Sequence, residues 1–299
     1  MPAIRLDGLT KSYGKARGIV DVDLVVTPGE VFGFLGPNGA GKTTTIRTLL
    51  DLIRPTSGKA EVLGLDSTKD SLEIRRRVGY LPGDLALWEW MTTRQLLEHL
   101  GRLRGRIDTR YRDELLGRFA VEPDRKIENL SSGNKQKVGI IQAFMHKPEL
   151  IILDEPTAGL DPLMQHATYE VIEEARAEGR TVFLSSHVLP EVERIAERVG
   201  IIRNGRVIEV ETVENLKART VRQLEVRFGA HAPTTAALRA VGGVTEATVS
   251  GDSAYVRIEG SMDPLVKALA AYEVRSLRTH ETPLEDIFLA MYRGADDAG

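Results

Sequence analysis

One stretch of eight residues combines the residue types and the spacing that bind the phosphates of a nucleotide. It fits the pattern G-x-x-x-x-G-K-[ST] and reads Gly36-Pro37-Asn38-Gly39-Ala40-Gly41-Lys42-Thr43. Backbone N–H groups of such a loop, and of the helix that follows it, point at a phosphate, and the helix dipole favours the negative charge. We therefore expect Lys42 to reach the β- and γ-phosphates and Thr43 to place its hydroxyl on Mg²⁺, with Thr44 beside them in the nucleotide site.

The segments on either side of this loop are those that its chemistry requires. Residues 31–35 form a short apolar run that suits a buried parallel strand. Residues 42–50 contain neither Gly nor Pro and predict a helix. A strand, a glycine-rich loop and a helix in this order predict that the chain binds a nucleoside triphosphate.

Two carboxylates follow a second apolar strand, predicted over residues 150–153. In an open α/β sheet, ligands bind beyond the carboxyl ends of the strands, so Asp154 and Glu155 should lie beside the phosphate loop. Asp154 suits Mg²⁺, either directly or through water. Glu155 points the other way from the same strand end and is our candidate for polarising the attacking water.

Further short motifs accompany these two elements in the order that is typical of ATP-binding cassette (ABC) ATPases. Over residues 1–215, all six elements together resemble that family. The four additional ones are Tyr13 in Lys11-Ser12-Tyr13-Gly14, a signature-like Leu130-Ser131-Ser132-Gly133-Asn134, a D-loop-like Ala158-Gly159-Leu160-Asp161, and a switch-like Ser185-Ser186-His187.

The resemblance implies roles for these residues. Tyr13 would stack on adenine, His187 would contact the γ-phosphate as a catalytic residue beside Glu155 and Lys42, and Asp161 would communicate between two sites. Ser131 can cap the helix that follows it and add a second anion-binding N-terminus.

In the ABC family this second helix faces the ATP of a partner subunit. The nucleotide-binding residues Ser131, Ser132, Gly133 and Asn134 would therefore act on the ATP held by another chain. The single cassette in this sequence then implies a head-to-tail homodimer that closes on ATP and opens after hydrolysis.

The chain departs from the family pattern at three positions. Ser132 replaces the usual Gly and Asn134 the usual Gln, and both remain small and polar, so we expect the signature to function. Gly83 stands where the family has a Gln that reaches Mg²⁺ and water; glycine has no side chain for this and loosens the backbone. Our hypothesis is that Asp84 substitutes, and the alternative is slower or more loosely coupled hydrolysis.

Composition narrows the class of protein. The chain has 299 residues, enough for two domains, a formal net charge of −3 with both signs interspersed, and no cysteine. We expect no nucleic-acid partner, no disulfides, no signal peptide and no membrane-spanning segment. A membrane role would then come through a permease partner that holds the chain at the cytoplasmic face of the cell membrane.

The predicted organisation is α/β, a phosphate-loop NTPase core with an inserted helical subdomain and a C-terminal α+β domain. We place the ABC ATP-binding domain at residues 1–215, with the helical subdomain at about 84–148, and the accessory or regulatory domain at residues 221–299. Residues 216–220 look like a linker. The C-terminal domain shows a βαββαβ order like the ferredoxin-type sandwich, and a last helix is predicted to begin near Thr282.

The closing segment and a tryptophan pair bear on function. Residues 282–288 resemble the tail of ATPase subunits from drug- and antibiotic-exporting ABC systems of the daunorubicin-resistance type, which implies an exporter ATPase. The alternatives are a soluble ABC ATPase and a regulatory module with weak hydrolysis. Of Trp88 and Trp90, which lie where ABC ATPases contact a membrane subunit, we expect one to be core and one to be exposed until the partner covers it.

Overall fold

The computed structural model describes residues 1–281 except 15, 106, 219–221 and 230. The chain divides into two compact units, Met1–Glu211 and Thr212–Gly299. Leu216, which we expected in a linker, lies instead in the short helix α8 (Val213–Ala218), where its side chain is 2% exposed. Residues 219 and 220 lie outside the described residues.

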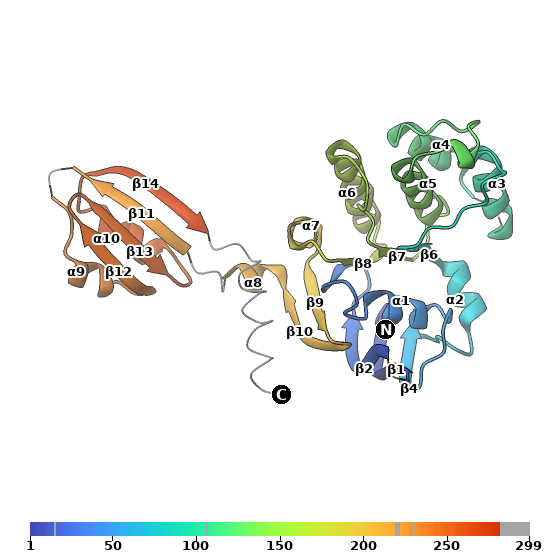
Figure 1. Cartoon of the computed structure of the whole chain (residues 1–299), viewed down its shortest axis with the longest axis horizontal. Coiled ribbons are helices and arrows are strands. Elements are labelled where there is room, and N and C mark those ends of the chain that lie inside the picture. Colours follow the sequence, from blue (N-terminus) through green and yellow to red (C-terminus); the bar gives the residue numbers. More distant parts are fainter. Residues whose placement is uncertain (15, 106, 219–221, 230, 282–299) are drawn as a thin grey trace. The chain divides into compact units, whose positions relative to one another are not determined.

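Two sheets form the first unit (Figure 1). One is largely parallel, in the order β10 (Arg206–Thr212), β9 (Arg198–Arg203), β3 (Val31–Leu35), β8 (Thr181–Ser186), β7 (Leu150–Asp154) and β6 (Val78–Leu81). The other has the order β2 (Ala16–Val26), β1 (Ile4–Tyr13), β4 (Ser57–Val62) and β5 (Leu65–Asp66), with antiparallel pairing. Strands β3, β7 and β8 are buried at every position, as expected for a parallel sheet that is covered on both faces.

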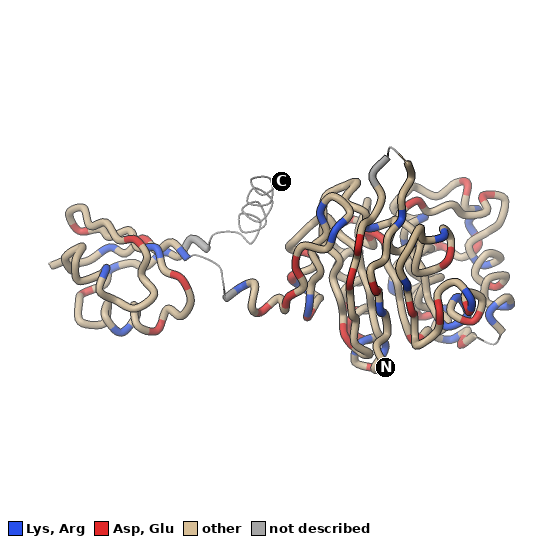
Figure 2. The backbone as a smooth tube through the Cα atoms, turned by 90° about the horizontal axis from the view of Figure 1, so that it is seen from below, with Lys and Arg blue, Asp and Glu red and all other residues tan. Residues whose placement is uncertain are grey.

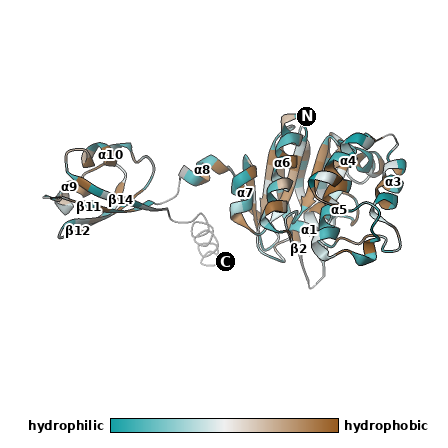
Figure 3. Cartoon of the chain, turned by 90° about the horizontal axis from the view of Figure 1, so that it is seen from above, coloured by the Kyte–Doolittle hydropathy of each residue, from teal (hydrophilic) through white to brown (hydrophobic). Residues whose placement is uncertain are grey.

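The main core of this unit lies between the two sheets and includes helix α1 (Lys42–Leu49). Phe32 and Phe183 stack there with ring centroids 5.8 Å apart, and the apolar interior is visible as brown strands in Figure 3. Helix α2 (Ser71–Arg77) leads into β6 and contributes Ile74 to the same core. The parallel strands contribute continuous apolar runs to this core, whereas β1 and β4 contribute only some of their residues.

Helices α5 (Ser132–Phe144), α6 (Pro162–Ala177) and α7 (Leu189–Ile195) pack on the parallel sheet as well. Helix α7 approaches β3 closely because Gly33 has no side chain: a Cβ there would lie 2.3 Å from Val192 Cγ1. The span predicted to be helical contains α3 (Thr93–Leu103), α4 (Thr109–Arg118), the 3₁₀ turn η1 (Ile127–Asn129) and α5, grouped in Figure 1.

The second unit has the predicted βαββαβ order. Its elements are β11 (Arg222–Phe228), α9 (Thr235–Arg239), β12 (Val244–Ser250), β13 (Ser253–Ile258), α10 (Asp263–Leu269) and β14 (Val274–Glu281). The antiparallel sheet runs β12-β13-β11-β14, and its core joins Val226 and Phe228 to Leu238 and Leu265 of the two helices. The helix predicted near Thr282 lies outside the described residues.

Charged residues of both signs are interspersed along the described parts of both units (Figure 2). No helix in the described part of the chain is long and apolar enough to cross a lipid bilayer.

Candidate functional site

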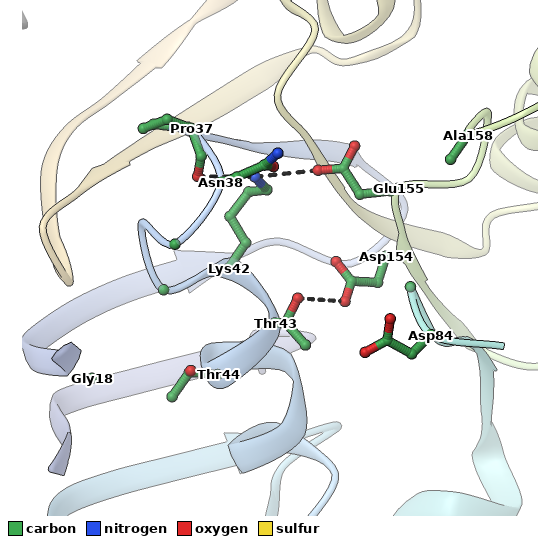
Figure 4. Close-up of a pocket in the computed structure, with 13 residues that line it drawn as sticks. Gly18, Pro37, Asn38, Lys42, Thr43, Thr44, Asp84, Asp154, Glu155 and Ala158 are labelled. Atoms are coloured by element: carbon green, nitrogen blue, oxygen red, sulfur yellow. Dashed lines mark hydrogen bonds and ion pairs between the residues drawn. The ribbon is translucent and has the colours of Figure 1, made fainter. Parts of the chain in front are cut away.

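The parallel sheet brings the predicted nucleotide residues to one edge. Strands β3, β7 and β8 run parallel, so the phosphate loop after β3, Asp154 at the end of β7 and Ser186 at the end of β8 share that edge. A cavity of about 400 Å³ lies there. The predicted residues that line it are Pro37, Asn38, Gly39, Gly41, Lys42, Thr43, Thr44, Asp154 and Glu155 (Figure 4).

The loop conformation depends on Gly41. Its φ is +116°, and a Cβ there would lie 2.7 Å from Ile19 Cγ2, so only glycine fits the turn into α1. Gly41 is the N-cap of α1, no side chain caps this N-terminus, and its first turn has no acidic residue. The N–H groups of that turn have no acceptor within the helix, which suits them to a phosphate. Gly36 and Ala40 complete the loop without lining the cavity.

Lys42 and His187 both contact the carboxylate of Glu155. Lys42, which is 5% exposed, lies 3.2 Å from Glu155 Oε1 and donates to the carbonyl oxygen of Gly36 at 2.5 Å. His187 Nδ1 lies 2.8 Å from Glu155 Oε2. Three groups that we predicted to be catalytic, from three separate segments, therefore meet at one carboxylate, and Figure 4 shows the Lys42 contact.

Asp154 is buried and receives two hydroxyl hydrogen bonds. Thr43 Oγ1 donates to Oδ2 at 2.8 Å, and Ser185 Oγ donates to Oδ1 at 2.5 Å. A hydroxyl and a carboxylate side by side at the cavity wall form the oxygen donor set that Mg²⁺ prefers. These two residues fit the metal that we predicted for them.

The role of Ser185 was missed from the sequence, where it counted only as part of the switch-like motif. Its backbone oxygen also accepts from the N–H of Glu155 at 3.2 Å. The only sequence signal for this role was a polar side chain at the end of an apolar strand, and that pattern is also typical of a turn.

Glu155 has a backbone conformation that needs support. Its φ of +54° is in the left-handed region, which costs a non-glycine residue roughly 1–3 kcal/mol. Gln136 on α5 supplies part of the support, because its Nε2 donates to the carbonyl oxygens of Glu155 and Pro156, each at 3.1 Å. Helix α5 is thereby connected to the turn of its own chain that carries Glu155.

Gly83 lies against the carboxylate of Asp154. A Cβ at Gly83 would be 3.1 Å from Asp154 Oδ2, so a larger residue would crowd that oxygen. Asp84 lines the same cavity, and its exposed carboxylate pairs with Arg47 at 3.3 Å. Burial and the Asp154 charge raise the pKa of nearby Tyr80 to about 12, so its phenol stays protonated at neutral pH.

The remaining predicted residues do not line this cavity. Ser131 caps α5 as expected, accepting from the N–H of Asn134 at 3.3 Å, and Asp161 caps α6 in the same way. Gly133 lies close to the D-loop, since a Cβ there would be 2.8 Å from the oxygen of Gly159. The structure therefore separates the signature residues and Asp161 from the phosphate cavity of the same chain, whereas Ala158 at the start of the D-loop lines it.

Tyr13 also lies outside the residues that line the cavity. Its ring is 46% exposed at the end of β1, with the ammonium of Lys11 5.3 Å from the ring centroid. The cavity gains two residues that the sequence did not single out as nucleotide ligands, Gly18 and Ala158. Ala158 belongs to the D-loop-like motif but was not assigned a contact with nucleotide, and Gly18 is a glycine in a strand, for which no sequence signal distinguishes a binding role.

The tryptophan prediction was wrong in one respect. Trp88 and Trp90 are 45% and 68% exposed, whereas we expected one of them to be core. The segment before α3 is not helical, and the ring of Trp88 makes an edge contact with the ring of His99, whose centroid is 5.1 Å away. An aromatic pair is thus presented on the surface.

A fold and a site of this kind define the phosphate-loop nucleotide hydrolases. Within that class, the chain belongs to the ABC transporter family as an ATP-binding subunit, and it is an ATPase whose hydrolysis is coupled to transport. A model of the family described as "ABC transporter" matches residues 19–158.

Curated relatives match between three quarters and nearly the whole of the chain. The daunorubicin/doxorubicin resistance ATP-binding protein DrrA of Streptomyces peucetius is 33% identical over 97% of this chain and 92% of its own length. The bacitracin transport ATP-binding protein BcrA of Bacillus licheniformis is 39% identical over 75% of this chain and 74% of its own. The chain is therefore related to ATPase subunits of drug and antibiotic transport systems.

A solved structure supports the same assignment. A dimeric ATP-binding cassette in a post-hydrolysis state, bound to ADP and phosphate, is 25% identical, with a TM-score of 0.63 over 70% of this chain and 98% of that one.

Proposed function

We propose that two copies of this chain sandwich ATP and drive a separate membrane-spanning permease that exports drugs or other amphipathic small molecules. The observation that carries the proposal is the division of the predicted ATP residues into two sets. The phosphate loop, Asp154 and Glu155 line one cavity, whereas Ser131–Asn134 and Asp161 do not line it. A second copy placed head to tail would supply the second set, and a solved cassette that resembles this chain is dimeric.

Within each site the residues of this chain would divide the chemistry. Lys42 and the uncapped N-terminus of α1 bind the phosphates, and Thr43 with Asp154 would hold Mg²⁺, which neutralises phosphate charge when bound. Glu155 orients and polarises the attacking water, and His187, in contact with Glu155, reaches the γ-phosphate. Tyr13 stacks on adenine.

The exposed tryptophan pair supports the permease partner. Two large exposed aromatic side chains two residues apart in one segment are typical of a protein contact, because aromatic residues are enriched at interfaces. Membrane association would come through that contact, since no described helix can span a bilayer. Nucleic acid is not a partner in this proposal, which agrees with the interspersed charges.

Fractionation of the source cells tests the proposal. We expect the native chain in the membrane fraction and a Trp88→Ala/Trp90→Ala double variant in the soluble fraction, with ATP affinity unchanged. Loss of the native chain should also raise sensitivity to one or more amphipathic antibiotics. A native chain that stays soluble with and without ATP would favour the soluble-ATPase alternative.

A further inference from the structure

A closed ring of hydrogen bonds joins the two loops that carry Glu155 and His187. Thr157 Oγ1 donates to Glu191 Oε1 at 2.5 Å, and Ser186 Oγ donates to Glu191 Oε2 at 2.8 Å. Thr157 follows Glu155 by two positions, and Ser186 directly precedes His187. The contact of 2.8 Å between His187 Nδ1 and Glu155 Oε2 closes the ring.

The hydroxyl groups of this ring are shielded from water. Thr157 is 5% exposed and Ser186 is fully buried, so water cannot readily replace Glu191 as their acceptor. Hydrogen bonds to a carboxylate are about twice as strong as those between neutral groups. Glu191 therefore fixes both loops from one side chain.

The helix that carries Glu191 is packed firmly against the parallel sheet. It belongs to α7, whose Val192 is fully buried and packs against the Gly33 position of β3. The turn that carries Thr157 is equally fixed, because the N–H of Ala158 donates to the carbonyl oxygen of Glu155 at 3.2 Å. A displacement of Thr157 would thus move Glu155, whose left-handed backbone has to be held by its surroundings.

We propose that Glu191 is a positioning residue that sets the separation of Glu155 and His187 through Thr157 and Ser186. It does not line the phosphate cavity. The inference rests on the catalytic roles proposed above for Glu155 and His187. Because ATP is bound mainly by the phosphate loop, disturbing the ring should lower kcat and leave the KM for ATP nearly unchanged.

The test measures kcat and KM of ATP hydrolysis for Thr157→Val, which removes one ring hydroxyl and keeps the shape of the side chain. We expect kcat to fall at least tenfold with KM within twofold, the same loss for Glu191→Gln, and recovery in Thr157→Ser, which keeps the hydroxyl. The matched control is Thr168→Val, because Thr168 is also buried but donates only within α6, to the carbonyl oxygen of Met164. The control should keep the native kcat.

A double-mutant cycle with His187→Ala shows whether the ring acts through the catalytic pair. We expect Thr157→Val to cost at least tenfold in the native chain and less than threefold in the His187→Ala background. Equal losses in both backgrounds, or a Thr157→Val variant as active as Thr168→Val, would overturn the proposal. Native turnover by His187→Ala would overturn the role of His187 instead, and the Thr157→Val comparison with Thr168→Val would still decide whether the ring matters.

Discussion

Helices α1 and α5 have the small N-cap residues Gly41 and Ser131, but their N-termini lie in different places relative to the phosphate cavity. The N-terminus of α1 has no side-chain cap and lines the phosphate cavity of its own chain. The N-terminus of α5 is capped by Ser131, and its first residue, Ser132, is exposed and does not line that cavity. On our proposal, the phosphate loop and α1 of one chain bind ATP without help from its own α5. Hydrolysis then needs α5 of a second chain.

The largest effect should come from the α1 side of the comparison. Glu155→Gln removes the base but keeps the size of the side chain, so we expect turnover to fall roughly 10²- to 10⁴-fold. ATP affinity should remain, because the loop and α1 bind the phosphates. Phosphate release and nucleotide titration measure the two quantities. Glu173→Gln, an exposed acid on α6, is the control, and normal hydrolysis by Glu155→Gln would show that we chose the wrong catalytic residue.

The next prediction tests the N-terminus of α5 by placing a negative charge there. In Ser132→Asp, a negative charge at the N-terminus of α5 should stabilise the fold by about 0.3–1 kcal/mol through the helix dipole. The same charge would repel the phosphates held by a partner chain, so we expect turnover to fall at least tenfold while ATP affinity is unchanged. Thermal unfolding and kinetics measure both effects, with Ser132→Ala as the control. An active Ser132→Asp variant would contradict a role for α5 at the partner's ATP.

A third prediction concerns the far end of α5. Burial and Arg104, whose Nη1 lies 2.8 Å from the Nε2 of His146, lower the pKa of His146 to about 4. The pKa in the unfolded chain is about 6.5, so the neutral form stabilises the fold above that pH and the stability is lost as the pH falls towards 4. Between pH 7 and pH 5 we expect a loss of about 2 kcal/mol.

Denaturant titrations at pH 7 and pH 5 measure this loss. His146→Gln should remove most of the acid sensitivity, whereas His166→Gln, a change at an exposed histidine on α6, should keep it. Equal acid sensitivity in the native chain and His146→Gln would show that other groups cause the loss.

The smallest effect tests the hypothesis that Asp84 takes the place of the glutamine that is missing at position 83. Because Asp84 lines the cavity beside Gly83, we expect Asp84→Ala to raise the Mg²⁺ concentration for half-maximal turnover a few-fold. Asp124→Ala is the control, since Asp124 is also an exposed carboxylate paired with an arginine, Arg94, but does not line the cavity. Unchanged turnover and Mg²⁺ dependence in Asp84→Ala would show that Asp84 does not take over the role of that glutamine.

The sequence predicts best what is local along the chain. The phosphate loop is a run of consecutive residues, and Asp154 follows from the rule that ligands bind at the ends of parallel strands. The link from Ser185 to Asp154 and the ring through Glu191 join residues about 30 positions apart, and Ser, Thr and Glu at such places are usually caps or surface residues. One of Trp88 and Trp90 was wrongly expected in the core, because aromatic side chains are usually buried, but the segment that carries them is not helical and leaves both exposed.

Light scattering of the Glu155→Gln chain with and without Mg·ATP tests the two-chain site most directly. We expect the molar mass to double with ATP and to return to that of a monomer in a Glu155→Gln/Ser132→Asp double variant. A Glu155→Gln chain that binds ATP and stays monomeric, or a dimer that forms equally well without ATP and with Ser132→Asp, would contradict it.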